Sequence, residues 1–202
     1  MSVCYIVGAG EFYGSFDPNK DDLVIAADGG YAALLERGIR CDLLIGDMDS
    51  IESVPSDIKT VRHKVEKDET DMHLAYLEGG ARGYSDFEIY GGVGGRSDHT
   101  FANYCLLAYI SKHGGRAKLY DKSSVATAVT NGDFVGYAEE GKTVSVFAFG
   151  GEARGVSLKG LYYPLEDGIL SPDFPLGVSN HALGGEYKIE VGDGTLLITF
   201  EI

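Results

Sequence analysis

Cysteine, basic charge and long apolar runs are all scarce in this chain of 202 residues. Its three cysteines are odd in number and widely spaced, which argues against a disulfide framework and against a CxxC zinc site. The opening MSVCYIVGAG lacks the basic start of a secretory signal, and the longest apolar stretch, CLLAYI, is too short to span a bilayer. We therefore expect a soluble protein of a reducing, cytoplasmic compartment, without a membrane partner.

The shortage of basic residues excludes a further class of function. Lys and Arg number 17 against 31 Asp and Glu, so the formal net charge is −14, and the acidic excess is spread over both halves of the chain. A nucleic-acid binder needs a basic surface to displace counterions, so we expect no nucleic-acid partner. An anionic ligand would need a metal ion or a few local cations, whereas a cationic substrate would need neither.

The first half of the chain alternates between two kinds of pattern. Short apolar runs bounded by Gly and Asp predict strands, and longer apolar segments that end at glycines predict helices. The predicted strands are 3–7, 23–27, 42–46, 60–65 and 86–92, and the predicted helices are 31–38, about 70–81 and 99–115. Strands separated by helices of this size indicate an α/β domain with a mostly parallel sheet covered on both faces.

Helical periodicity ends near residue 117, and short strand candidates follow. They cover 125–130, 134–139, 143–150, 187–191 and 195–202, and the Gly-Asp-Gly at 192–194 predicts a hairpin between the last two. Several short strands at this spacing indicate an all-β sandwich or barrel. We predict two domains with a boundary near 115–122, namely an α/β domain over 1–117 and an all-β domain over 118–202.

Two glycine motifs resemble phosphate-binding loops. The string GYAEEGKT (136–143) matches the P-loop pattern, but a β pattern follows it where the P-loop needs a helix, so we interpret it as a turn into a strand. The string GAGEFYG (8–14) follows a strand but misses the G-x-G-x-x-G spacing. It is consistent with a phosphate-binding turn or with a tight turn at the sheet edge.

Charged and glycine residues gather where the predicted strands of the first half end. In an open α/β sheet, ligands bind outside the carboxyl ends of parallel strands, so these segments converge there. Asp28 follows one strand, Asp47 and Asp49 follow the next, and Lys67, Thr70 and Asp71 precede a helix. A last segment joins a strand to a helix and contains Gly91, Gly92, Gly94, Gly95, Arg96, Asp98 and His99.

These residue types suit a metal ion and a phosphate group. Asp47 and Asp49 are one residue apart and can face the same side, and Asp71 can add a third oxygen ligand for Mg²⁺. Each Asp alone is better explained as a cap of a turn or helix, but four such sites at strand ends favour a shared site. Arg96 offers a rigid fork for phosphate oxygens and Lys67 a point charge. Asp98 is an N-cap candidate or a ligand-orienting base.

Five motifs together resemble the thiamine pyrophosphokinase family. They are, in this order, ADGG (27–30), GDMDS (46–50), KDETD (67–71), GGRSDHTFAN (94–103) and GVSN (177–180). Each string alone is common, whereas their combination and order are specific. The resemblance implies an N-terminal α/β domain, a C-terminal β-sandwich and a homodimer with active sites formed between subunits. It also implies the reaction, in which pyrophosphate moves from ATP to the hydroxyl of thiamine and AMP is released.

The resemblance also implies residue roles. Asp47, Asp49 and Asp71 would bind Mg²⁺, Arg96 and Lys67 would hold the phosphates, and Asp98 would assist the metal or the hydroxyl. The implied ATP-binding residues are Asp28, Gly29, Gly30, Thr70, Gly92, Gly95, Arg96 and His99, and the implied substrate-binding residues are Asp98, Asn103, Ser179 and Asn180. Ser179 and Asn180 would contact thiamine from the second subunit. Some relatives stack thiamine on a tryptophan, but this chain has none, so a Tyr or Phe must serve. Ser97 stands where the family often has an apolar residue.

Other functions use similar residues. A metal-dependent transferase or phosphatase of the DxD type could employ Asp47 and Asp49, and a pyrophosphokinase could act on another alcohol, such as a pterin. A non-catalytic sensor of nucleotide or thiamine would bind these ligands tightly and form no product.

Overall fold

The computed structural model describes residues 2–46, 58–62 and 68–202. Two compact units account for the chain: unit 1 contains Met1–Leu106 and Ala117–Lys122, and unit 2 contains Leu107–Arg116 and Ser123–Ile202. No helix within the described ranges combines the length and the apolar character needed to cross a membrane.

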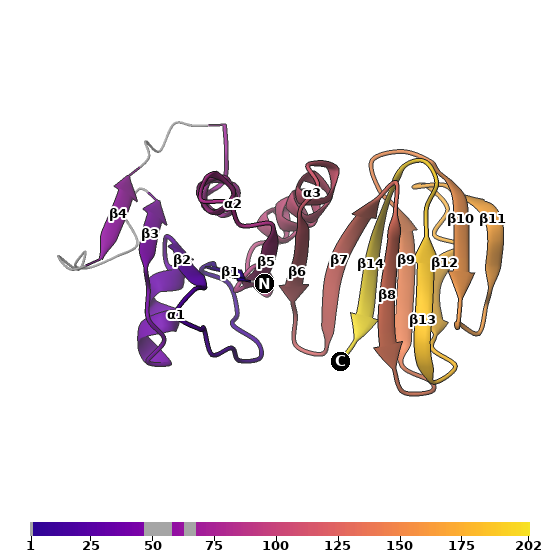
Figure 1. The fold of residues 1–202 in the computed structure, drawn as a ribbon, viewed down its shortest axis with the longest axis horizontal. Coiled ribbons are helices and arrows are strands. Elements are labelled where there is room, and N and C mark those ends of the chain that lie inside the picture. The colour runs from indigo at the N-terminus through magenta and orange to yellow at the C-terminus, as the bar shows by residue number, and fades with distance from the viewer. Residues whose placement is uncertain (1, 47–57, 63–67) are drawn as a thin grey trace. The chain divides into compact units, whose positions relative to one another are not determined.

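Unit 1 is built on parallel strands (Figure 1). The central strand β1 (Cys4–Val7) pairs in parallel with β2 (Leu23–Ala27) on one side and with β5 (Asp86–Tyr90) on the other. Strands β3 (Leu43–Gly46) and β4 (Lys59–Arg62) extend the sheet beyond β2, again in parallel. Strand β6 (Arg116–Tyr120) lies next to β5 in the strand order. The mostly parallel sheet expected from the sequence is confirmed.

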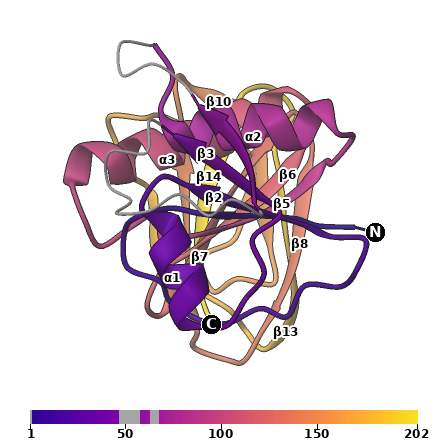
Figure 2. The ribbon, with the colours of Figure 1, turned by 90° about the vertical axis from the view of Figure 1, so that its left-hand side faces the viewer.

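Helices cover both faces of these strands because successive strand side chains point to opposite faces. Helix α1 (Gly30–Glu36) and helix α2 (Asp71–Ala81) lie on opposite faces in Figure 2. Leu34 of α1 packs into one core cluster with Tyr5, Val7, Val24, Ala26, Leu44 and Tyr90. Helix α3 (Ser97–Lys112) follows β5, and its residues up to Leu106 belong to unit 1.

Unit 2 is an antiparallel β-sandwich. Four of its strands are neighbours in one sheet, in the order β12 (Gly177–His181), β9 (Thr143–Ala148), β14 (Thr195–Glu201) and β7 (Ser124–Thr130). The other has the order β11 (Leu165–Leu170), β10 (Ala153–Lys159), β13 (Gly185–Glu190) and β8 (Asp133–Ala138). Val146 and Ile198 of the first sheet share a single buried core with Val156 and Ile189 of the second. Of the two expected architectures, the structure has the sandwich.

The predicted hairpin at Gly192–Asp193–Gly194 is wrong. The strands on either side of it lie in different sheets, because β13 pairs with β8 and β10 whereas β14 pairs with β7 and β9. The N–H groups of Gly192 and Asp193 both donate to the carbonyl of Arg154 on β10, and Gly194 donates to the side chain of Asn131. These bonds tie the turn to other segments, so it carries the chain from one sheet to the other.

The P-loop-like string is a turn between two strands, as the sequence predicted. Strand β8 ends at Ala138 and strand β9 begins at Thr143, so no helix follows the glycines. The Lys142 ammonium, which would bind phosphate in a P-loop, donates to the Glu201 carboxylate and to the carbonyl of Ile202.

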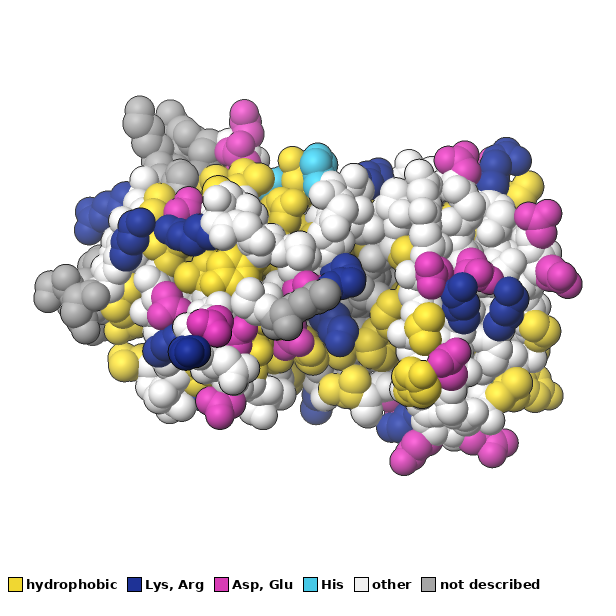
Figure 3. Space-filling view, in the orientation of Figure 1, with side chains coloured by type: hydrophobic (Ala, Val, Ile, Leu, Met, Phe, Trp, Pro, Cys, Tyr) yellow, Lys and Arg dark blue, Asp and Glu magenta, His cyan; other side chains and the backbone are white. Residues whose placement is uncertain are grey.

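Charges of both signs are interspersed on the face of the molecule drawn in Figure 3. In unit 2, the Lys188 ammonium lies between the carboxylates of Asp133 and Glu190, and Lys159 also pairs with Glu190. These two hydrogen-bonded lysines lower the pKa of Glu190 to about 2. The net negative charge is therefore not gathered into one acidic patch on this face.

Candidate functional site

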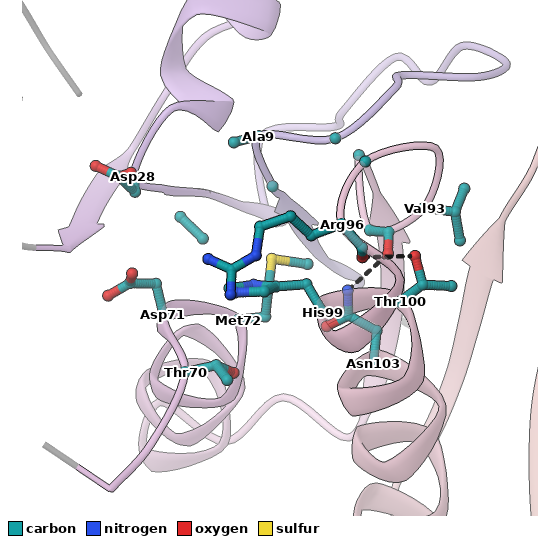
Figure 4. Close-up of a pocket in the computed structure, with 16 residues that line it drawn as sticks. Ala9, Asp28, Thr70, Asp71, Met72, Val93, Arg96, His99, Thr100 and Asn103 are labelled. Atoms are coloured by element: carbon teal, nitrogen blue, oxygen red, sulfur yellow. Dashed lines mark hydrogen bonds between the residues drawn. The ribbon is translucent and has the colours of Figure 1, made fainter.

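A cavity of about 430 Å³ opens in unit 1 where the parallel strands end (Figure 4). The segments that line it follow β1, β2 and β5 or begin α2 and α3, as expected for the carboxyl edge of such a sheet. The lining residues are Gly8, Ala9, Gly10, Ala27, Asp28, Thr70, Asp71, Met72, Gly91, Gly92, Val93, Gly95, Arg96, His99, Thr100 and Asn103.

Glycines bring two loops of this cavity into backbone contact. The N–H groups of Gly8 and Gly10 donate to the carbonyls of Tyr90 and Gly91, both at 2.8 Å. A Cβ atom on Gly10 would lie 2.4 Å from the carbonyl oxygen of Val93, so a side chain does not fit there. Of the two interpretations of GAGEFYG, its place in the cavity favours a ligand-binding turn.

Asp28 stands out among the lining residues. It follows β2 with a φ of 47°, a left-handed conformation that is uncommon for a residue other than glycine. Its Oδ1 atom is buried and has no hydrogen-bond partner within the described part of the chain. A buried carboxylate oxygen is costly unless a cation or a donor meets it, so this atom indicates a partner that the described residues do not supply.

Asp71 lies across the cavity from the loops, at the start of α2. The Thr70 hydroxyl caps this helix by accepting the N–H of His73 at 3.2 Å, which places Asp71 in the first turn. Figure 4 shows the carboxyl groups of Asp28 and Asp71 on the same side of the cavity. Two carboxylates at a helix start and a strand end suit a hard cation such as Mg²⁺.

Arg96 reaches into the cavity from the loop before α3, toward the side where Asp28 and Asp71 lie (Figure 4). Its guanidinium also makes two hydrogen bonds to Asp98, from Nε to Oδ1 at 3.2 Å and from an Nη atom to Oδ2 at 2.7 Å. Hydrogen bonding to Arg96 lowers the pKa of Asp98, and the same bonds raise the pKa of Arg96. Both side chains are largely exposed, so this pair can exchange for a bound anion.

Asp98 is not the N-cap of the helix. Helix α3 begins at Ser97, so Asp98 lies within its first turn, where its Oδ1 accepts the N–H of His99 at 2.9 Å. Asn103, one of the predicted substrate-binding residues, is 4% exposed and donates from Nδ2 to the carbonyl of Gly92 at 2.7 Å. It therefore braces the glycine loop from within the cavity wall.

The cavity brings together many of the residues that the sequence predicted for ATP, metal and substrate. It gathers Asp28, Thr70, Asp71, Gly92, Gly95, Arg96, His99 and Asn103. Gly29 is the N-cap of α1 and Gly30 its first residue, and neither lines the cavity. Asp47, Asp49 and Lys67 lie outside the described residues. Within the described ranges, no group of three or more His, Cys, Asp or Glu side chains could hold a metal ion.

The predicted thiamine residues lie in unit 2, on β12. Ser179 is exposed and has a φ of 56°, and Asn180 is buried. Asn180 lines an apolar cavity of about 310 Å³ together with Tyr163, whose side chain is exposed. The rings of Tyr162 and His181 stack at 4.6 Å, and Tyr163 meets Tyr162 edge-on at 4.9 Å.

Sequence reasoning did not select Tyr162, Tyr163 or His181. The only sequence signal for these residues was the Tyr-Tyr pair between two apolar segments. Such a pair is equally typical of a strand in the core. What makes the pair conspicuous is its exposure, 55% for Tyr162 and 61% for Tyr163, and this is visible only in the folded chain.

Two family models match the chain. The model for the thiamin pyrophosphokinase catalytic domain matches residues 18–134, and the model for the thiamin pyrophosphokinase vitamin B1 binding domain matches residues 134–196. The thiamine pyrophosphokinase of Bacillus subtilis (strain 168) is 29% identical over 188 residues, which cover 89% of this chain and 87% of that protein.

Solved structures have the same fold. The thiamine pyrophosphokinase of Bacillus subtilis aligns with a TM-score of 0.88 and 22% identity over 100% of this chain and 99% of the other. The thiamin pyrophosphokinase from Geobacillus thermodenitrificans aligns with a TM-score of 0.85 and 24% identity over 99% of this chain and 97% of the other. The thiamin pyrophosphokinase from Candida albicans aligns with a TM-score of 0.76 and 16% identity over 99% of this chain and 88% of the other. With both family models matched in order along the sequence, the chain belongs to the thiamin pyrophosphokinase family.

Proposed function

We propose that the chain transfers the pyrophosphoryl group of ATP to the hydroxyl of thiamine, giving thiamine diphosphate and AMP. The thiamine hydroxyl releases its proton, its oxygen forms a bond to the β-phosphorus, and the bond between the β-phosphorus and the oxygen that remains with AMP breaks. The observation that carries the proposal is the cavity of unit 1. It combines glycine-rich loops, the Arg96 guanidinium and a buried carboxylate oxygen of Asp28 that has no hydrogen-bond partner among the described residues. Such transfer depends mainly on positioning and charge stabilisation, which these groups supply.

We assign the ATP side of the reaction to this cavity. The backbone at Gly95 is exposed to phosphate oxygens, whereas Gly92 is buried in the cavity wall and its carbonyl accepts from Asn103. The fork of Arg96 can bind two phosphate oxygens. His99 and Thr70 also line this cavity. Gly29 and Gly30 act indirectly, because they let α1 begin directly after Asp28. Lys67 remains a proposed phosphate ligand from the sequence.

The donors fit a magnesium ion, with Asp47, Asp49 and Asp71 as its proposed ligands. Asp28 joins this set because its buried Oδ1 lacks a partner in the described ranges and lies in the same cavity as Asp71. When bound, the ion would offset the negative charge that builds up on the transferring phosphates. Oxygen donors of this type are what Mg²⁺ prefers.

Asp98 is proposed to receive and orient the hydroxyl of thiamine. While Arg96 holds it, the lowered pKa keeps Asp98 ionised and makes it a weak base. Phosphate oxygens that draw Arg96 away would free the carboxylate to accept a hydrogen bond from the hydroxyl. ATP binding would thereby prepare Asp98 for the acceptor.

Ser179 and Tyr163 are proposed to contact thiamine. A cationic thiazolium is attracted to the face of an aromatic ring, and Tyr163 is exposed beside the apolar cavity of unit 2. Tyr163 would then take the place of the tryptophan that the chain lacks. The sequence resemblance further supports a homodimer with shared active sites and a cytoplasmic location, which sedimentation and cell fractionation would test.

The nucleotide product tests the proposed function directly. The chain is incubated with Mg-ATP, with and without thiamine, and the nucleotides are separated. We expect AMP only when thiamine is present, in equal amount to thiamine diphosphate. ADP would indicate ordinary phosphoryl transfer or hydrolysis, and thiamine binding without any product would indicate a sensor.

A further inference from the structure

A bulge interrupts strand β12 at the proposed thiamine residue. Strand β12 pairs with β9 through Gly177 and Val146 and again through Asn180 and Val144, so it carries one extra residue between these pairs. Ser179 lies in this bulge with its left-handed φ of 56°. Its N–H leaves the strand ladder and donates to the Oγ atom of Ser145 at 3.0 Å.

Ser145 is well suited to hold this bulge. It lies on β9, and only 6% of it is exposed. A serine in a left-handed conformation is strained and persists only where its surroundings fix it. The hydroxyl of Ser145 supplies such a contact, which keeps Ser179 at the surface.

The side chain of Asn180 makes hydrogen bonds to the backbone of a segment that is distant in sequence. Its Oδ1 accepts the N–H of Tyr163 at 3.0 Å and the N–H of His181 at 2.9 Å. Its Nδ2 donates to the carbonyl of Tyr163 at 2.7 Å. A further backbone bond joins the N–H of Tyr162 to the carbonyl of His181 at 2.9 Å. The amide thus imitates a strand partner for Tyr163.

These bonds argue against a direct contact between Asn180 and thiamine. Only 2% of Asn180 is exposed, and Oδ1 already accepts two hydrogen bonds. What the amide controls is the main chain at Tyr163, from which the exposed ring projects. Ser145 controls Ser179 in the same way.

We propose that Asn180 and Ser145 are positioning residues for thiamine, a role that rests on the proposed function. Asn180 fixes the backbone of Tyr163, and Ser145 fixes the backbone of Ser179. Asn180 therefore acts through the ring of Tyr163, and neither buried side chain touches the substrate.

Steady-state kinetics of four single variants and one double variant test this proposal. Asn180→Asp keeps the shape of the side chain but replaces the donor to the Tyr163 carbonyl, and Ser145→Ala removes the acceptor of the Ser179 N–H. We expect each to raise KM for thiamine about 10-fold, as the loss of one buried hydrogen bond allows, and to change KM for ATP less than about 2-fold. Thr195→Val is the matched control, because Thr195 is 3% exposed in the same unit and its hydroxyl pairs with that of Thr130. It should lower Tm comparably and leave both KM values unchanged.

The fourth variant, Tyr163→Ala, separates positioning from direct contact. If Asn180 acts through the Tyr163 ring, Asn180→Asp adds less than about 2-fold to KM for thiamine in the Tyr163→Ala background. Effects that multiply would show an independent contact and overturn the proposal for Asn180. An unchanged KM in Ser145→Ala would overturn it for Ser145. A wild-type chain that makes no thiamine diphosphate would instead refute the proposed function, so the two failures are distinguishable.

Discussion

Asp28 combines two features that folding alone does not favour. Its φ of 47° is a conformation that few side chains adopt, and its buried Oδ1 has no partner in the described part of the chain. Each feature costs free energy, and a protein keeps such costs where a bound ligand recovers them. Asparagine tolerates the left-handed region as well as aspartate does, so it can replace Asp28 without backbone strain.

We therefore expect Asp28→Asn to separate activity from stability. The variant keeps the shape of the residue and removes its negative charge, so thiamine diphosphate formation should fall about 100-fold or more. Tm should stay level or rise, because a buried charge is lost. Asp167→Asn is the matched control, since Asp167 also has a positive φ of 50° but lies exposed on β11. Normal turnover in Asp28→Asn would remove this carboxylate from the site.

Arg96 allows a second test on a single side chain. Its two hydrogen bonds to Asp98 show the fork geometry that a phosphate would use, and a lysine cannot reproduce it. We expect Arg96→Lys to lower kcat/KM for ATP roughly 10-fold to 100-fold, which corresponds to a loss of about 1.4 to 2.8 kcal/mol of transition-state stabilisation. Arg154→Lys, which alters a surface pair with Glu152, should leave kcat/KM unchanged. An active Arg96→Lys enzyme would mean that a point charge suffices.

Among the secondary-structure elements, α2 shows how closely a helix can approach the sheet. A Cβ on Gly79 would lie 2.8 Å from the Cys4 sulfur and 2.9 Å from the Phe87 ring, so this glycine permits the contact. The neighbouring Gly80 is exposed, and a Cβ there meets nothing within 4 Å. Replacing these two adjacent glycines of one helix should therefore have opposite effects on stability.

The two alanine variants should shift stability in opposite directions. Gly79→Ala overpacks the contact with β1 and β5 and should cost about 1–3 kcal/mol of unfolding free energy. Gly80→Ala removes backbone entropy from the unfolded chain and should add about 0.5–1 kcal/mol. Denaturant unfolding monitored by circular dichroism measures both. A stabilised Gly79→Ala would show that α2 can move away from the sheet at little cost.

The elements of unit 1 could be predicted because each carries a local pattern. The strand predicted over 23–27 is β2, and the helix predicted over 70–81 is α2 at Asp71–Ala81. Strands β6, β10, β11 and β12 were missed. The segments LEDGIL and GVSNH of β11 and β12 contain few β-branched residues, and both pair with register shifts. Their strand character comes from neighbours far along the chain, which local sequence patterns do not reveal.

The residues of the candidate site also fall into those that the sequence predicts and those that it does not. Asp71, Arg96 and His99 were predictable because they stand at strand ends and helix starts, and parallel topology brings such positions together. Tyr163 was not predictable, because its backbone is held by hydrogen bonds from the side chain of Asn180, which lies 17 residues away in sequence. The left-handed conformations of Asp28 and Ser179 were equally hidden in the sequence.

For the molecule as a whole, the proposed reaction needs groups from both units. Asp28, Asp71 and Arg96 belong to unit 1, whereas Ser179 and Tyr163 belong to unit 2. The proposed homodimer with shared sites assigns each active site the unit 1 of one subunit and the unit 2 of its partner. A site within one chain is the alternative, and the two arrangements differ in how damaged subunits combine.

Mixed dimers distinguish these arrangements. Asp28→Asn inactivates the ATP side of its own subunit, and a second variant, Ser179→Ala with Tyr163→Ala, inactivates the thiamine side. If sites are shared, a mixed dimer contains one doubly damaged site and one intact site, so co-refolding equal amounts should restore about a quarter of wild-type turnover, since about half of randomly assembled dimers are mixed. If each site lies within one chain, every site keeps one defect and turnover stays at the level of the separate variants. Each variant co-refolded with itself is the control, and sedimentation velocity establishes that dimers form, so inactive mixed dimers would contradict the shared site.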